Sequence, residues 1–156
     1  MKKKAIIGIR PNAKVIEALR ITLANSYALY LKTQNYHWNV TGNQFSSLHL
    51  LFEKQYSDLA EAIDEIAERI RALDCLAPGS FEIFNNMKDI KDAIEGAASD
   101  HMLKDLRDDN IHLAELLKDG VAIAQKHNDE ATADLLIERI RVHEKNAWML
   151  NSSLQK

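Results

Sequence analysis

The strongest constraint on the fold is an apolar stripe that runs through residues 45–73. Apolar residues recur there at steps of three and four for about seven turns, which is the period of one face of an α-helix. The stripe consists of Phe45, Leu48, Phe52, Leu59, Ile63, Ile66, Ile70 and Leu73. One helix cannot bury such a face alone, so the stripe predicts packing against other long helices.

The rest of the chain repeats this pattern. Apolar residues at helical spacing predict three further long helices, and a break at 76–80 ends the second helix. A short helix is predicted over 85–96, inside a crossover that lets the second and third long helices run parallel. The three further long helices cover residues 12–40, 99–127 and 130–152.

Composition agrees with an all-α fold. Five Gly and two Pro in 156 residues are too few for a turn-rich β fold. The length fits one domain, over 12–156, preceded by a tail at 1–11. Gly42 is expected to take a positive φ at the end of the first helix, and Asn43 and Ser99 are expected to cap the second and third long helices. We therefore predict an all-α four-helix bundle.

Five residues near the apolar stripe carry metal-binding side chains: His37, His49, Glu53, Asp64 and Glu68. The four in the second helix lie to one side of the centre of the stripe, so they are expected to point away from the bundle core. His37 falls in the last turn of the first helix. A tight antiparallel turn would bring it level with His49 and allow the two to share a site.

Distance along the helix divides these ligands into two pairs. The fifteen residues from His49 to Asp64 correspond to about 22 Å at the helical rise, whereas metal–ligand bonds are about 2 Å long. Other helices of the same chain could complete each pair, or two copies could pair antiparallel about a twofold axis. We favour the second arrangement because the flank also carries small residues, which allow close approach: Ser46, Ser57, Ala60 and Ala67. The simplest alternative is an acidic, solvated helix face.

These residues stand in a set of longer runs: His37-Trp38-Asn39-Val40-Thr41-Gly42, Phe45, Leu48-His49, Phe52-Glu53, Asp64, residues 67–73, Thr132-x-Asp134 and Glu144-Lys145-x-x-Trp148-Met149-Leu150. The runs resemble the Dps family, the small ferritins called DNA-binding proteins from starved cells. The resemblance covers nearly the whole chain and is weakest before residue 12 and across 74–98. It implies a ferritin-like four-helix bundle that forms a hollow dodecamer, oxidises ferrous iron, preferably with hydrogen peroxide, and stores the ferric mineral inside.

The resemblance also implies a role for each candidate ligand. Each ferroxidase centre would lie between twofold-related subunits, with His37, His49 and Glu53 from one and Asp64 and Glu68 from the other. The family often has Asp at the position of Glu53, so the reach of this carboxylate is altered here. Trp38 matches a tryptophan beside the centre that is discussed as an electron donor. Anchoring of the subunit interface is the alternative role for Trp38.

Three carboxylates cluster at the start of the last helix: Asp129, Glu130 and Asp134. Favourable negative charge at a helix N-terminus would explain them without any further role. By resemblance, Glu130 and Asp134 match acidic residues that line a threefold pore for iron entry. A ring of repeated carboxylates would concentrate ferrous ions by electrostatic attraction.

The tail carries four positive charges, at Lys2, Lys3, Lys4 and Arg10. They could form a DNA-contacting arm, or they could belong to an ordinary solvated terminus. Tails repeated on a dodecamer would act together, giving weak and salt-sensitive DNA binding. The net charge of −3 on each subunit opposes this.

Several other site types are excluded or disfavoured. The single cysteine, Cys75, rules out an intrachain disulfide and a cysteine-rich zinc or iron–sulfur site within the chain. The Glu-x-x-His motif of larger ferritins is missing, and only Asp109-x-x-His112 approximates it. Since neither a signal peptide nor an apolar run of membrane-spanning length is recognisable, we expect a soluble, cytoplasmic protein without a membrane partner.

The expected function is therefore that of a ferroxidase and iron store that consumes hydrogen peroxide, or dioxygen, and limits oxidative damage. Histidine nitrogens and carboxylate oxygens suit ferrous iron. The alternative is a DNA-compacting or partner-binding assembly whose iron site is vestigial.

Overall fold

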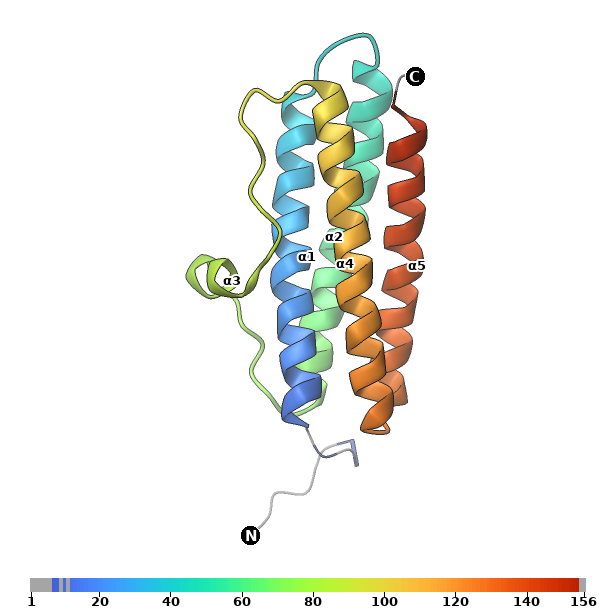
Figure 1. Cartoon of the computed structure of the whole chain (residues 1–156). Helices are drawn as coiled ribbons and strands as arrows, with labels where there is room; N and C mark the ends of the chain where they lie inside the picture. The colour runs from blue at the N-terminus through green and yellow to red at the C-terminus, as the bar shows by residue number, and fades with distance from the viewer. Residues whose placement is uncertain (1–6, 9, 11, 155–156) are drawn as a thin grey trace.

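The computed structural model describes residues 7, 8, 10 and 12–154, and in this part of the chain it contains five α-helices and no β-strand. Four long helices lie side by side, and a short one stands beside α1, outside the bundle (Figure 1). The all-α four-helix bundle predicted from the sequence is confirmed. The helices are α1 (Ala13–Asn39), α2 (Phe45–Ala72), α3 (Phe81–Met87), α4 (Ser99–Lys126) and α5 (Glu130–Ser152).

The connections set the direction of each helix. A short turn joins α1 to α2, and another joins α4 to α5, so each pair runs antiparallel. The crossover from α2 to α4 runs the length of the bundle past α1, which makes α2 and α4 parallel (Figure 1). None of the helices in the described residues is long and apolar enough to cross a lipid bilayer.

The predicted stripe supplies the α2 side of the core. Six of its eight members are buried, whereas Ile63 is half-buried and Phe45 is 44% exposed. The buried members pack with apolar residues of α1, α4 and α5 in a single cluster. The six are Leu48, Phe52, Leu59, Ile66, Ile70 and Leu73.

The predicted bounds of the four long helices are right to within one residue, but two of the predicted capping residues are not. Asn12 caps α1, because its side chain accepts hydrogen bonds from the N–H groups of Lys14 and Val15. The residues that precede α2 and α4 are Gln44 and Ala98, and neither makes a side-chain capping bond. The predicted caps at Asn43 and Ser99 are therefore wrong, each by one residue.

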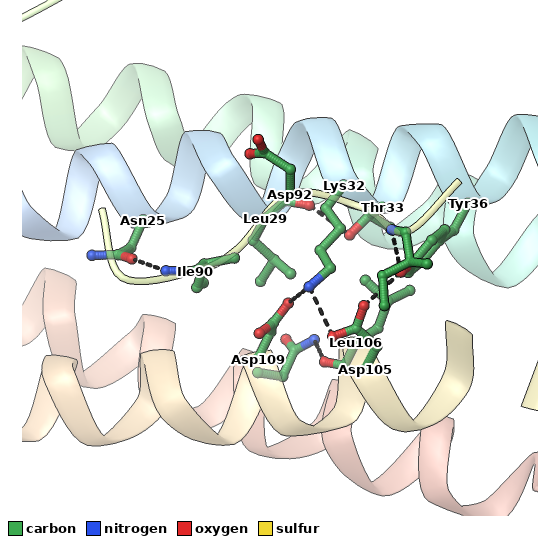
Figure 2. A network of polar contacts seen from close by, with 12 residues as sticks. Asn25, Leu29, Lys32, Thr33, Tyr36, Ile90, Asp92, Asp105, Leu106 and Asp109 are labelled. Atoms are coloured by element: carbon green, nitrogen blue, oxygen red, sulfur yellow. Dashed lines mark hydrogen bonds and ion pairs between the residues drawn. The ribbon is translucent and has the colours of Figure 1, made fainter. Parts of the chain in front are cut away.

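The short crossover helix exists, but its predicted position is wrong. It covers Phe81–Met87, where Ser80 caps it by accepting from the N–H of Ile83, and residues 88–98 are not helical. Backbone N–H groups of this segment bond to α1: Asn25 Oδ1 accepts from Asp89 and Ile90 at 2.9 and 3.1 Å. Figure 2 shows the Asn25–Ile90 contact. Side chains of α1 thus compete successfully with local helix formation.

A buried ion-pair network joins α1 to α4 (Figure 2). The Lys32 ammonium donates to Asp105 Oδ1 at 2.8 Å and to Asp109 Oδ2 at 2.7 Å. The Tyr36 hydroxyl donates to Asp105 Oδ2 at 2.5 Å and accepts from the N–H of Ile94 at 3.2 Å. Burial raises the pKa of Tyr36 above its ordinary value, and it also raises the pKa of Asp109. The contact with Lys32 opposes this rise, because a nearby positive charge favours the ionised carboxylate, and it makes Asp109 an ion-pair partner of Lys32.

Candidate metal centre

The two histidines predicted to share a site are stacked on each other. The ring centroids of His37 and His49 are 3.7 Å apart, and their planes differ by 17°. His37 is buried, and His49 is half-buried. The turn between α1 and α2 creates this contact by placing the end of one helix beside the start of the next.

Gly42 makes this turn tight. Its φ is +104°, a conformation that other residues rarely adopt, and its carbonyl accepts from the N–H of Phe45 at 3.0 Å. The positive φ predicted for Gly42 is confirmed. The tight turn brings the last turn of α1 level with the first turns of α2.

A reciprocal pair of hydrogen bonds fixes both rings. His37 Nδ1 lies 2.7 Å from the carbonyl oxygen of His49, and His49 Nδ1 lies 2.8 Å from the carbonyl oxygen of His37. A carbonyl oxygen can only accept, so each Nδ1 must carry the proton and donate it. Nε2 is then the nitrogen with a free lone pair in each neutral ring. This is the arrangement by which proteins orient histidines that bind metals.

The three candidate carboxylates lie on α2 and are exposed to solvent: Glu53, Asp64 and Glu68. Among the residues that the structure describes, no three His, Cys, Asp or Glu side chains of one chain are grouped closely enough to hold a metal ion. One chain therefore presents the histidine pair near the start of α2 and the Asp64/Glu68 pair further along the same helix.

Small residues lie along α2 beside and between these two parts of the helix. Ser46, Ser57 and Ala60 are exposed, and Ala67 is half-buried. Trp38, directly after His37, is 59% exposed. A large apolar side chain and a strip of small residues thus lie at the surface beside the candidate ligands.

The predicted pore cluster is divided by the structure. Glu130 and Asp134 are exposed at the start of α5. Asp129 is buried: it caps α5 by accepting from the Thr132 N–H at 3.1 Å, and it pairs with the Arg69 guanidinium at 2.7 Å. The carboxylate of Asp129 is therefore held inside the bundle, and the two exposed carboxylates of this cluster are Glu130 and Asp134.

The tail can be followed only in part. Arg10 is exposed, whereas Lys2, Lys3 and Lys4 lie outside the described residues. The DNA contacts expected of these three lysines therefore stay a prediction.

One aromatic neighbour of the histidines was missed in the sequence. The ring of Tyr56 meets His37 edge-on, with 5.1 Å between centroids and an interplanar angle of 73°. Tyr56 follows His49 by seven residues, which is two helical turns, so both residues lie on the same face of α2. That spacing was the signal by which the sequence could have identified it.

Known proteins of similar sequence and structure place this arrangement in a family. The Ferritin-like domain family matches residues 16–156. The chain is similar to DNA protection during starvation protein 2 of Bacillus anthracis, with 37% identity over 145 residues that cover 93% of this chain and 99% of that protein. In structure it is similar to Dps from Vibrio cholerae O1, described as a ferritin-like diiron-carboxylate protein, with a TM-score of 0.87 and 36% identity over 91% of this chain and 89% of that one. It is also similar to Dps from Staphylococcus aureus, with a TM-score of 0.88 and 30% identity over 91% and 95% of the two chains. The chain belongs to the Dps family of ferritin-like proteins.

Proposed function

We propose that this mini-ferritin oxidises ferrous iron to ferric iron with hydrogen peroxide, at centres formed between two subunits, and stores the product inside a closed dodecamer. The observation that carries the proposal is the histidine pair. Two stacked imidazoles, each with Nδ1 bound to the carbonyl oxygen of the other residue, offer two oriented Nε2 donors. Ferrous iron is a substrate that accepts such nitrogen and carboxylate ligands.

The histidines alone are too few to bind iron firmly and stabilise its ferric form. Glu53, one turn after His49, adds a carboxylate from the same chain. Asp64 and Glu68 would come from a second copy that packs antiparallel on the α2 flank, where a twofold axis creates two identical centres. The small residues of that flank support the close approach that this arrangement requires.

The chain's residues would contribute to oxidation by holding and neutralising iron. Carboxylate oxygens stabilise the higher positive charge of ferric iron, which favours loss of an electron. A ligand set of only a few protein groups leaves coordination positions for hydrogen peroxide. Glu130 and Asp134, exposed at the start of α5, would attract ferrous ions to an entry pore in the assembled shell.

A ferrous oxidation assay tests the proposal. Protein is mixed anaerobically with ferrous iron, hydrogen peroxide is added, and ferric absorbance is followed. We expect His37→Ala and Asp64→Ala each to slow oxidation by at least about tenfold, because each removes a ligand. His112→Ala and Asp119→Ala are matched controls that remove an exposed histidine and an exposed carboxylate of α4, away from the α2 flank, and they should leave the rate unchanged. Equal rates in all five proteins would rule out the enzymatic function.

A further inference from the structure

A line of polar side chains joins α2 to α5. Near the end of α2, the Arg69 guanidinium donates to Asp129 Oδ1 at 2.7 Å and to Thr132 Oγ1 at 2.9 Å. Further back along α2, Asp58 Oδ2 accepts from the Arg139 guanidinium at 2.7 Å. Side chains of α2 therefore bond directly to α5 at two levels of the bundle.

Gln55 lies in the core of the bundle, on the side of α2 that faces α5. It is 4% exposed, and its amide nitrogen and oxygen are the buried side-chain polar atoms that have no hydrogen-bond partner among the described residues. Gln55 precedes Asp58 by about one helical turn, so its side chain is directed to the same seam. Buried amides are nearly always hydrogen-bonded, because an unpaired one has lost its contacts with water without replacement. The Gln55 amide therefore requires a partner.

The register of the two helices places Asn146 opposite Gln55. Gln55 stands fourteen residues before Arg69, and Asn146 stands fourteen residues after Thr132, which Arg69 contacts. Because α2 and α5 are antiparallel, equal steps in opposite directions reach the same level. Fourteen residues are two heptads, after which packed helices present the same face to each other. Asn146 is only 9% exposed, which agrees with an inward-facing position.

We propose that a water molecule is bound between Gln55 and Asn146, where it forms a third polar link between α2 and α5. The two amides are not bonded to each other, since neither polar atom of Gln55 has a protein partner. An amide group both donates and accepts hydrogen bonds, and a water molecule can do the same toward both side chains. Internal waters of this kind commonly satisfy polar groups that the protein leaves unpaired.

The charges around this site favour a neutral molecule over an ion. Both facing side chains are uncharged amides. The nearest ion pair, Asp58 with Arg139, carries no net charge. A metal ion or an anion would then be buried without a counter-charge, which is far more costly than burial of a neutral polar molecule. Water is the neutral donor and acceptor that is always present.

A crystal structure of the assembled protein, at a resolution that shows ordered water, tests the site directly. We expect a water molecule within hydrogen-bond distance of the Gln55 amide and of the Asn146 side chain. A structure of Gln55→Met should lack this water, because methionine keeps a side chain of similar length without an amide. A native structure in which Gln55 bonds directly to Asn146 or to another protein group, or in which no water contacts its amide, would overturn the proposal.

Urea unfolding at a fixed protein concentration tests the bridge in solution. If one water links both side chains, Gln55→Met and Asn146→Ala each break the same link. The shift in urea midpoint of the double variant should then differ from the sum of the two single shifts. The matched control combines Gln55→Met with Asn39→Ala, which alters an exposed asparagine in the last turn of α1, and these shifts should add. Additive shifts for Gln55 and Asn146 as well would show that no molecule connects them.

Discussion

His143 on α5 makes the stability of the subunit depend on pH in a way that can be calculated. It is 1% exposed, and its Nδ1 donates to Asn110 Oδ1 on α4 at 2.8 Å. Desolvation by burial, and then the nearby positive charge of Arg139, lower the pKa of His143 from its ordinary 6.5 to about 3. Arg139 itself pairs with Asp58 at 2.7 Å, so its charge stays in place.

The sign of the effect follows from which state binds more protons. Below pH 6.5 the unfolded chain protonates His143 and the folded chain does not, so acid favours unfolding. The free energy of unfolding should fall by about 1.4 kcal/mol per pH unit in the window between the two pKa values. Between pH 7.5 and pH 5, this residue alone should lower the free energy of unfolding by roughly 2 kcal/mol, and the decrease should level off near pH 3.

Urea unfolding at pH 7.5, 6 and 5 measures this dependence, at a fixed protein concentration because the proposed assembly would also contribute to stability. His143→Gln is the comparison, because glutamine can still donate to Asn110 but does not titrate. The native protein should lose roughly 2 kcal/mol more than the variant between pH 7.5 and pH 5. Identical pH dependence in the two proteins would mean that His143 is not held neutral in the core.

Three further predictions concern the polar network and the packing. Lys32→Met should lower the free energy of unfolding by about 3 kcal/mol, because it leaves two largely buried carboxylates without a counter-ion. Urea unfolding at pH 7.5 measures this, and Lys104→Met at an exposed site is the control that should change little. Gly120→Ala should lower the free energy of unfolding by about 1 kcal/mol although alanine favours helices, because the new Cβ would lie 2.9 Å from the Leu136 Cδ1 atom. A higher urea midpoint for this variant would refute the prediction. Asn25→Ala should speed hydrogen exchange at the two crossover N–H groups that its side chain holds, and unchanged exchange rates would show that they are held otherwise.

The long helices could be predicted because their signal is local and repeated. Each has several turns of apolar residues at one spacing, so an error at any one position does not change the conclusion. The crossover has no such redundancy. Residues 85–96 have helical composition, yet Asn25 and Tyr36 on α1 bind the backbone N–H groups that a helix would use. Those partners are far away in the sequence, so no local pattern reveals them.

In the candidate site, too, the feature set by local sequence could be predicted, whereas the contacts set by side-chain orientation or by distant partners could not. The meeting of His37 and His49 could be predicted, because it depends on one helix turn and one short loop. The reciprocal Nδ1 bonds and the contact with Tyr56 depend on side-chain orientation, which helical spacing alone does not determine. Asp129 was grouped with Glu130 and Asp134 because the three carboxylates cluster in the sequence at the start of the last helix, but its ion pair with Arg69 on α2 holds its side chain inside the bundle.

Shared centres make a prediction that a centre within one chain does not. Subunits carrying His37→Ala/His49→Ala keep Asp64 and Glu68, and subunits carrying Asp64→Ala/Glu68→Ala keep both histidines. Either protein alone has no complete centre. A mixed pair has one intact centre and one that lacks every altered ligand.

Co-assembly of the two variants in equal amounts, followed by the ferrous oxidation assay, therefore measures directly whether centres are shared. Random pairing gives half mixed pairs with one intact centre of two, so activity should return to about a quarter of the native rate. Activity no higher than that of the separate variants would contradict the account and place each centre within a single chain.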